Sequence, residues 1–165
     1  MPFAARPARP EDAEAIARIY NEGIEDRFAT FETRHRSGAD VVRWVEDGFP
    51  LVVVEESGGV VAWASAAPYR PGREAYAGIG DFSVYVARSE RGRGAGRAAL
   101  EALAAEARGR GYWKLVSRIF PENEASLALC RALGFREVGV YRRHARLDGE
   151  WRDVVVVELL LDGSL

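Results

Sequence analysis

Cysteine is almost absent from this chain of 165 residues, which contains a single one, Cys130. One thiol excludes a disulfide within the chain and a metal site built from several cysteines, and it fits a reducing compartment. The few histidines, together with the acidic residues, show no metal-ligand spacing. The sequence therefore implies no metal.

Long apolar runs are also absent. The amino-terminal stretch MPFAARPARPEDAEAI has no apolar signal core, and no run elsewhere is long enough to span a bilayer. The net charge of −2 gives no reason to expect nucleic acid or an anionic membrane as a partner. We therefore expect a cytoplasmic protein with neither partner.

The residues that are present predict one mixed α/β domain spanning residues 1–165. With 48% hydrophobic and 29% charged residues, the chain is typical of a globular protein large enough to bury its own core. The order of the segments predicts a mostly antiparallel, partly parallel sheet. Helical periodicity covers residues 10–24, 40–47, 98–107 and 123–133, and strand-like patterns cover 51–55, 60–65, 82–87, 113–120, 136–142 and 154–161.

The glycine run Arg91-Gly92-Arg93-Gly94-Ala95-Gly96 lies between an expected strand and an expected helix. Glycines at alternate positions let the backbone turn its N–H groups toward one point, and the positive end of the new helix points there too. Such a junction can hold a phosphate or a pyrophosphate.

Three interpretations of this run are weighed. The first is a flexible turn whose arginines are solvated. The second is a dinucleotide-binding turn, since residues 94–99 fit G-x-G-x-x-A and Glu122 is available as a ribose ligand. Residues 87–93 argue against it, because a dinucleotide turn leaves its strand almost at once. The third is a coenzyme A site, because Arg91, Gly94 and Gly96 resemble the R-x-x-G-x-G signature of GNAT-type N-acetyltransferases.

A second motif favours the third interpretation. The stretch from Asn123 to Phe135 resembles the block N-x-x-[AS]-x-x-L-[YH]-x-x-x-G-[FY] of the same superfamily, at the right distance downstream. From the residues alone, Asn123 is expected to cap a helix that Gly134 ends. Residues 5–160 as a whole resemble the phosphinothricin, methionine sulfoximine and arsinothricin N-acetyltransferases, through PLVVVE, REAY, DFSVYV and LDGEWRDV.

The resemblance implies a GNAT fold, a homodimer, and transfer of an acetyl group from acetyl-CoA to a small amino-acid-like substrate by direct attack in a ternary complex. Its substrate would be a toxic glutamate analogue or another small amine. The residues implied in binding acetyl-CoA are Phe82, Val84, Tyr85, Val86, Arg91, Gly92, Arg93, Gly94, Ala95, Gly96, Arg97, Asn123, Ser126 and Cys130.

Asp81 stands where the resemblance places the carboxylate that takes a proton from the substrate ammonium, directly or through a water. An Asp at this point could also simply cap the start of the strand. Cys130 fills the usual position of the acid that protonates the departing thiolate. It could serve as a weak acid or be a small buried residue, in which case Tyr141 or water supplies the proton.

The substrate-binding residues implied by the resemblance lie in two loops and an arginine-rich run. Guanidinium groups suit the acidic groups of such substrates because they present a planar bidentate fork. The candidates are Phe31, Arg70, Arg73, Tyr76 and His144. Core packing for Phe31 and a solvated surface for Arg70 and His144 remain open. Two other functions are also open: a dimeric sensor that holds coenzyme A without turnover, and a nucleotide-dependent oxidoreductase.

Overall fold

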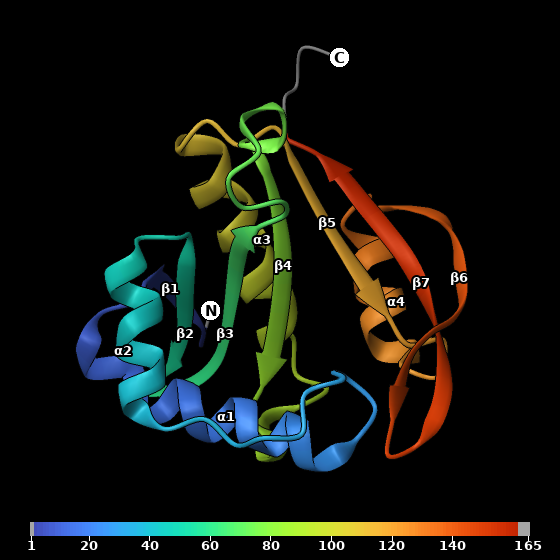
Figure 1. The fold of residues 1–165 in the computed structure, drawn as a ribbon. Helices are drawn as coiled ribbons and strands as arrows, with labels where there is room; N and C mark the ends of the chain where they lie inside the picture. The colour runs from blue at the N-terminus through green and yellow to red at the C-terminus, as the bar shows by residue number, and fades with distance from the viewer. Residues whose placement is uncertain (1, 162–165) are drawn as a thin grey trace.

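The computed structural model describes residues 2–161, which form one twisted sheet flanked by helices (Figure 1). The strands are β1 (Ala4–Pro7), β2 (Leu51–Glu56), β3 (Gly59–Pro68), β4 (Ile79–Val86), β5 (Lys114–Ile119), β6 (Arg136–Leu147) and β7 (Glu150–Leu160). The helices are α1 (Ala13–Asp26), α2 (Gly38–Asp47), α3 (Ala95–Gly109) and α4 (Glu124–Ala132). Single 3-10 turns lie at Pro10–Asp12, Glu74–Tyr76 and Arg88–Glu90.

The sheet has the order β1-β2-β3-β4-β5-β7-β6, and its one parallel pair is β4 with β5. This confirms the mixed, mostly antiparallel sheet expected from the sequence. Strand residues alternate between two cores because successive side chains leave a strand on opposite faces. Val52 and Val54 pack with α3 and α4, whereas Leu51 and Val53 pack with α1 and α2.

The parallel pair is short, and this shapes the molecule. Residues 79–81 of β4 pair with residues 114–116 of β5, and beyond that point the two strands diverge (Figure 1). The β4 backbone groups that would continue the ladder therefore face a gap. Ala87 N–H donates to Val61 on β3, at 2.8 Å, and backbone groups alternate in direction along a strand. The amides of Val84 and Val86 consequently point into the gap.

Local signals in the sequence located most elements correctly. Asn123 Oδ1 accepts from Ser126 N–H at 3.2 Å, so Asn123 does cap α4. Gly134, with a φ of +88°, follows the end of that helix as expected. The turn at Ser57 and Gly58 also joins two antiparallel strands, with positive φ at both residues.

Several elements begin or end elsewhere than expected, and one was not predicted. Strand β1 was missed, because a strand of four residues that ends in a proline is too short to show a period. The chain at Pro10 starts a 3-10 turn, and α1 begins only at Ala13. Strand β6 continues past residue 142 to Leu147, because Asp148 and Gly149, both at positive φ, make a two-residue hairpin turn. None of the described helices is long and apolar enough to cross a membrane.

Candidate active site

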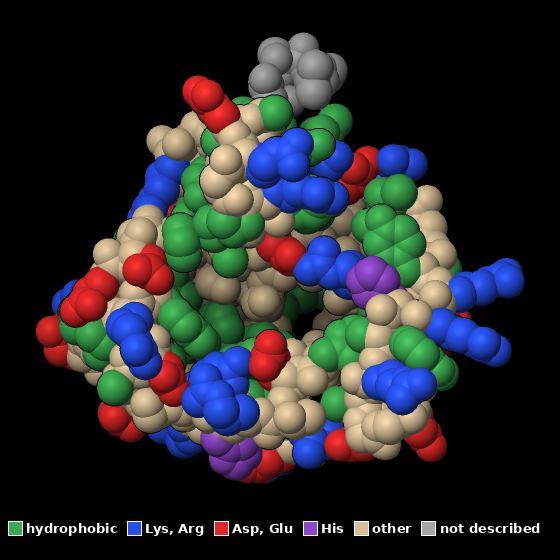
Figure 2. Space-filling model, viewed as in Figure 1, with side chains coloured by type: hydrophobic (Ala, Val, Ile, Leu, Met, Phe, Trp, Pro, Cys, Tyr) green, Lys and Arg blue, Asp and Glu red, His purple; other side chains and the backbone are tan. Residues whose placement is uncertain are grey.

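The gap between β4 and β5 opens into a hollow on the face shown in Figure 2. We call its middle part the central cavity, with a volume of about 360 Å³. It joins a glycine-side cavity of about 320 Å³ near the start of α3, and an outer cavity beside β6. Val84, Tyr85 and Ser126 line both the central and the glycine-side cavities, and Arg118 and His144 line both the central and the outer cavities. The glycine-side, central and outer cavities therefore adjoin one another in that order, and we refer to them together as the path.

The start of α3 faces the glycine-side cavity with free backbone donors. Gly92 and Gly94 have φ of +80° and +96°, which brings the chain sharply into the helix. No side chain caps this helix, and its first turn contains no acidic residue. The first N–H groups and the positive end of the helix dipole thus remain available to an anion.

Gly96 lets α3 lie close to its neighbours at this point. A Cβ on Gly96 would be 3.3 Å from Val86 Cγ2 and 3.6 Å from Leu129 Cδ2. A larger side chain would push into the glycine-side cavity, which Gly96 lines. The residues present therefore fit a diphosphate followed by a narrow chain running along β4.

The arginines of the glycine run point in different directions. Arg91 lines the glycine-side cavity, where its Nη1 lies 2.7 Å from Asp26 Oδ2 and its Nε donates to Val86 O at 3.3 Å. Burial acts to raise the pKa of Asp26, but hydrogen bonds from Arg91 and Arg88 outweigh it and lower that pKa. Asp26 was not predicted as a site residue, because its position at the end of an amphipathic helix gave no signal.

Arg93 turns away from the three cavities. Its Nη2 lies 2.8 Å from Glu56 Oε1, and its guanidinium lies over the ring of Phe3. Arg97 lines the glycine-side cavity, although its Nε also donates to Glu101 one turn along α3, at 2.6 Å. Of the predicted arginines, Arg91 and Arg97 are thus brought to the cavity and Arg93 is not.

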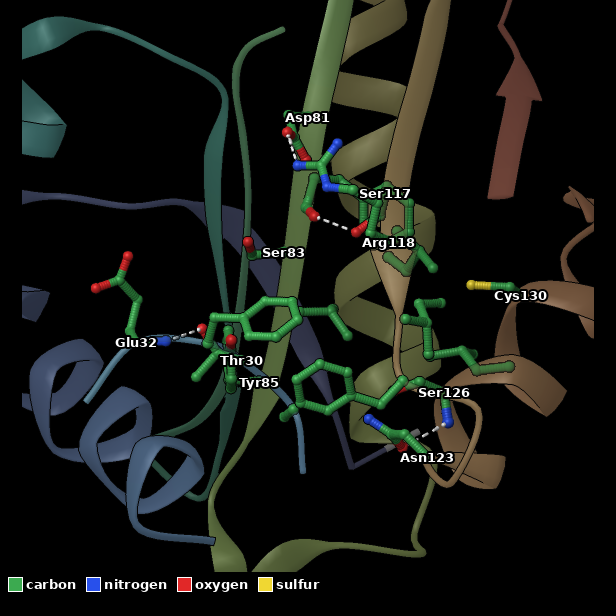
Figure 3. Close-up of a pocket in the computed structure, with 18 of the residues that line it drawn as sticks. Thr30, Glu32, Asp81, Ser83, Tyr85, Ser117, Arg118, Asn123, Ser126 and Cys130 are labelled. Carbon is green, nitrogen blue, oxygen red and sulfur yellow. Dashed lines mark hydrogen bonds and ion pairs between the residues drawn. The ribbon is translucent and has the colours of Figure 1, made fainter. Parts of the chain in front are cut away.

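An ion pair crosses the gap at the boundary between the central and outer cavities. Asp81 on β4 projects into the central cavity, and its Oδ2 pairs with Nη2 of Arg118 on β5 (Figure 3). The two residues meet because Asp81 is the last residue of the parallel pairing, opposite Val116, and Arg118 lies two positions further on the same face. Arg118 was not predicted as a site residue. A charged residue inside the apolar strand WKLVSRIF was the signal that could have found it.

The outer cavity gathers most of the predicted substrate-binding residues. It is lined by Arg70, Arg73, Tyr141, His144, Arg118, Tyr69 and Pro71. The Tyr141 and His144 rings stack with centroids 4.9 Å apart. Tyr76 lies beneath the two loop arginines, with its ring centroid 5.5 Å from Arg70 Cζ and 5.9 Å from Arg73 Cζ. Tyr76 therefore supports these arginines and does not line the outer cavity.

The sequence of this chain matches a known protein family over most of its length. The acetyltransferase (GNAT) family model matches residues 15–135. The chain belongs to the GNAT family of acetyltransferases.

Relatives in this family resemble the chain along nearly its whole length. The L-methionine sulfoximine/L-methionine sulfone acetyltransferase of Pseudomonas aeruginosa is 32% identical, covering 98% of this chain and 96% of its own. A phosphinothricin N-acetyltransferase of Streptomyces coelicolor is 34% identical over 93% of each chain. Among solved structures, a putative acetyltransferase of Salmonella typhimurium with its cofactor acetyl-CoA has a TM-score of 0.92 at 30% identity, covering 99% of this chain and 96% of its own.

Within this GNAT fold, the cofactor-binding residues predicted on β4 and α4 lie around the same path. Phe82, Val84, Tyr85, Asn123, Ser126 and Cys130 line the central cavity, and Val86, Gly92, Gly94, Ala95 and Gly96 line the glycine-side cavity. Phe31 lines the central cavity as well and packs edge-on against Phe120, at 4.8 Å between centroids. Glu122, considered as a ribose ligand, instead pairs with Arg152 at 3.4 Å and lines none of the three cavities described.

Cys130 lies in the wall of the central cavity with 3% of its surface exposed. Burial raises the pKa of its thiol to about 11. The thiol therefore stays protonated at neutral pH, and the side chain forms part of the buried wall of the cavity. Burial likewise raises the pKa of Tyr85, which keeps that hydroxyl neutral.

Proposed function

We propose that this protein transfers the acetyl group of acetyl-CoA to the amino group of a small amino-acid-like substrate. One observation carries the proposal: the uncapped start of α3 and the unpaired edge of β4 lead along one path to Asp81. The start of α3 suits the diphosphate, and the β4 edge suits the pantetheine arm, which would bind like an added strand. No metal enters this scheme.

Each step of the transfer has a group in this chain to assist it. Asp81, directly or through a water, takes a proton from the substrate ammonium, which frees the nitrogen lone pair. The nitrogen attacks the thioester carbonyl carbon, and the amides of Val84 and Val86 are the donors available to the oxyanion. The C–N bond forms, and the nitrogen, which is cationic after the attack, loses its second proton to water. The C–S bond then breaks, and the thiolate takes its proton from water or from the Tyr141 hydroxyl.

The substrates we propose are phosphinothricin, methionine sulfoximine and arsinothricin, which would make the enzyme a detoxifying or resistance factor. Arg70 and Arg73 in the outer cavity support this choice, since they can pair with an acidic side-chain group. We also propose that the protein is cytoplasmic and that it forms a homodimer. The dimer is supported by Val138, Val140 and Trp151 on the β6–β7 hairpin, which are about half exposed. A molecular mass from light scattering that equals that of a monomer would refute the proposed dimer.

Asp81→Asn tests the catalytic role. The amide keeps the size of the side chain and an oxygen for Arg118, but it cannot accept the proton. We expect kcat to fall by about 100-fold at pH 7, and the loss to shrink at high pH as free amine becomes abundant. Thiol release is measured with the three substrates and with ordinary amino acids as controls. Unchanged turnover of Asp81→Asn would show that Asp81 is not the proton acceptor. If the wild-type protein gives heat of binding with acetyl-CoA but releases no thiol with any amine, the coenzyme A sensor is favoured.

A further inference from the structure

Arg118 stands apart from the other arginines of the site. It is the one arginine that lines the central cavity among residues 2–161, and it also borders the outer cavity. Of the three cavities described, Arg70 and Arg73 border the outer one alone, and their guanidinium groups lie over tyrosine rings in an exposed loop. Of these three arginines, Arg118 alone is therefore next to Asp81, the carboxylate that is expected to take a proton from the substrate ammonium.

Most of the hydrogen-bonding capacity of Arg118 is unused. A guanidinium carries five N–H donors in a fixed fork. In the described part of the chain, the recorded side-chain partner of Arg118 is Asp81 Oδ2, bound through one Nη2 donor. About a third of the Arg118 side chain, 36%, stays exposed, and it is exposed toward the cavities that it lines. Donors thus remain for a ligand that enters beside Asp81.

The charges of the Asp81–Arg118 pair are complementary to those of a free amino acid in its zwitterionic form. Standard bond lengths place the ammonium nitrogen about 2.5 Å from the carboxylate carbon of an α-amino acid. An ammonium beside Asp81 therefore leaves the α-carboxylate within reach of the adjacent guanidinium, where the planar fork can bind two oxygens. The four charges then alternate in sign.

We propose that Arg118 binds the α-carboxylate of the substrate, so that the Asp81–Arg118 pair selects free α-amino acids. This inference rests on the proposed function and adds to it the residue that recognises the α-carboxylate. A plain amine, or the amino terminus of a peptide, has no α-carboxylate. Its ammonium would compete with Arg118 for Asp81, and the guanidinium would gain no new carboxylate partner in exchange. Arg70 and Arg73 are left for a second acidic group on the substrate side chain.

The test compares two forms of one substrate. The best substrate among phosphinothricin, methionine sulfoximine and arsinothricin is assayed as the free acid and as its α-carboxamide, with wild-type protein and with Arg118→Gln. Glutamine can still bond to Asp81 but lacks the charged fork. We expect kcat/KM to fall 10- to 100-fold with the acid and less than threefold with the carboxamide. Arg118→Lys should recover part of the preference for the acid.

Two controls separate recognition from folding. Arg43→Gln, on the exposed side of α2, should change neither value, and the Kd for acetyl-CoA of Arg118→Gln should stay within twofold of wild type. If that Kd changes more, Arg118→Lys is assayed in its place with the same two substrates. An equal loss for the acid and the carboxamide, or no loss, would overturn the inference. Wild-type protein that acetylates neither form would instead overturn the proposed function.

Discussion

Replacing Gly94 with alanine tests the acetyl-CoA site at the residue where α3 begins. Gly94 has a φ of +96°, and the nearest atom to an added Cβ would be Phe3 Cε2, at 3.9 Å. The methyl group therefore meets only ordinary contacts, and the effect of the substitution comes from the backbone. An L-residue in the left-handed region is strained by about 1–2 kcal/mol.

This strain acts on affinity because the free loop can relax and the bound loop cannot. In the free protein, alanine favours a loop that turns the first amides of α3 away from the cavity. Binding must reverse that change, so the Kd for acetyl-CoA should rise by about 5- to 30-fold, as 1–2 kcal/mol implies. Calorimetry with acetyl-CoA measures this, and the KM for the amine should change much less.

Gly48→Ala provides the matched control. Gly48 ends α2 with a φ of +78°, has no neighbour within 4 Å of an added Cβ, and does not line the three cavities. It should lose a similar 1–2 kcal/mol of unfolding free energy and leave the Kd for acetyl-CoA unchanged. If Gly94→Ala binds acetyl-CoA as tightly as wild type does, the reasoning about the start of α3 is refuted.

Two further predictions concern titrating groups. Cys130→Ala should leave the pH profile of kcat unchanged between pH 6 and 9, because a thiol with its pKa raised to about 11 stays protonated throughout. A fall in kcat of more than tenfold would instead identify Cys130 as the acid that protonates the departing thiolate. Asp12→Asn should cost about 3 kcal/mol of unfolding free energy at pH 7, since Arg6 donates to both Asp12 oxygens at 2.9 Å. The hydrogen bonds from Arg6 lower the pKa of Asp12 below 3.8, so this contribution is present above pH 3.8 and is lost as the pH falls further. Denaturant unfolding of both proteins from pH 7 to pH 2.5 should show the difference narrowing only below about pH 4, and a constant difference would contradict the assignment.

Features set by neighbouring residues could be predicted from the sequence. The cap at Asn123 and the stop at Gly134 each depend on a few adjacent residues, and the structure has them where expected. The glycine run was predicted as a junction between strand and helix for the same reason. Strand β1 was not, because a segment of four residues becomes a strand only through its pairing with β2.

The pairing of side chains from distant segments could not be predicted in this way. Arg93 was assigned to acetyl-CoA together with Arg91, yet Glu56 and Glu90 hold it away from the cavities. Asp26 binds Arg91 across 65 residues of sequence because α1 ends beside the glycine run. Tyr76 was expected to line the substrate site but lies beneath the loop arginines.

The sequence by itself determined the order of the helices and of the strands after β1, the GNAT family resemblance and the junction suited to a diphosphate, because these depend on local periodicity and on motifs of closely spaced residues. Only the tertiary structure decided where β4 and β5 part, and therefore that a cavity exists between them. It also decided that Asp81 meets Arg118, since that contact depends on the register of two parallel strands that are far apart in the chain.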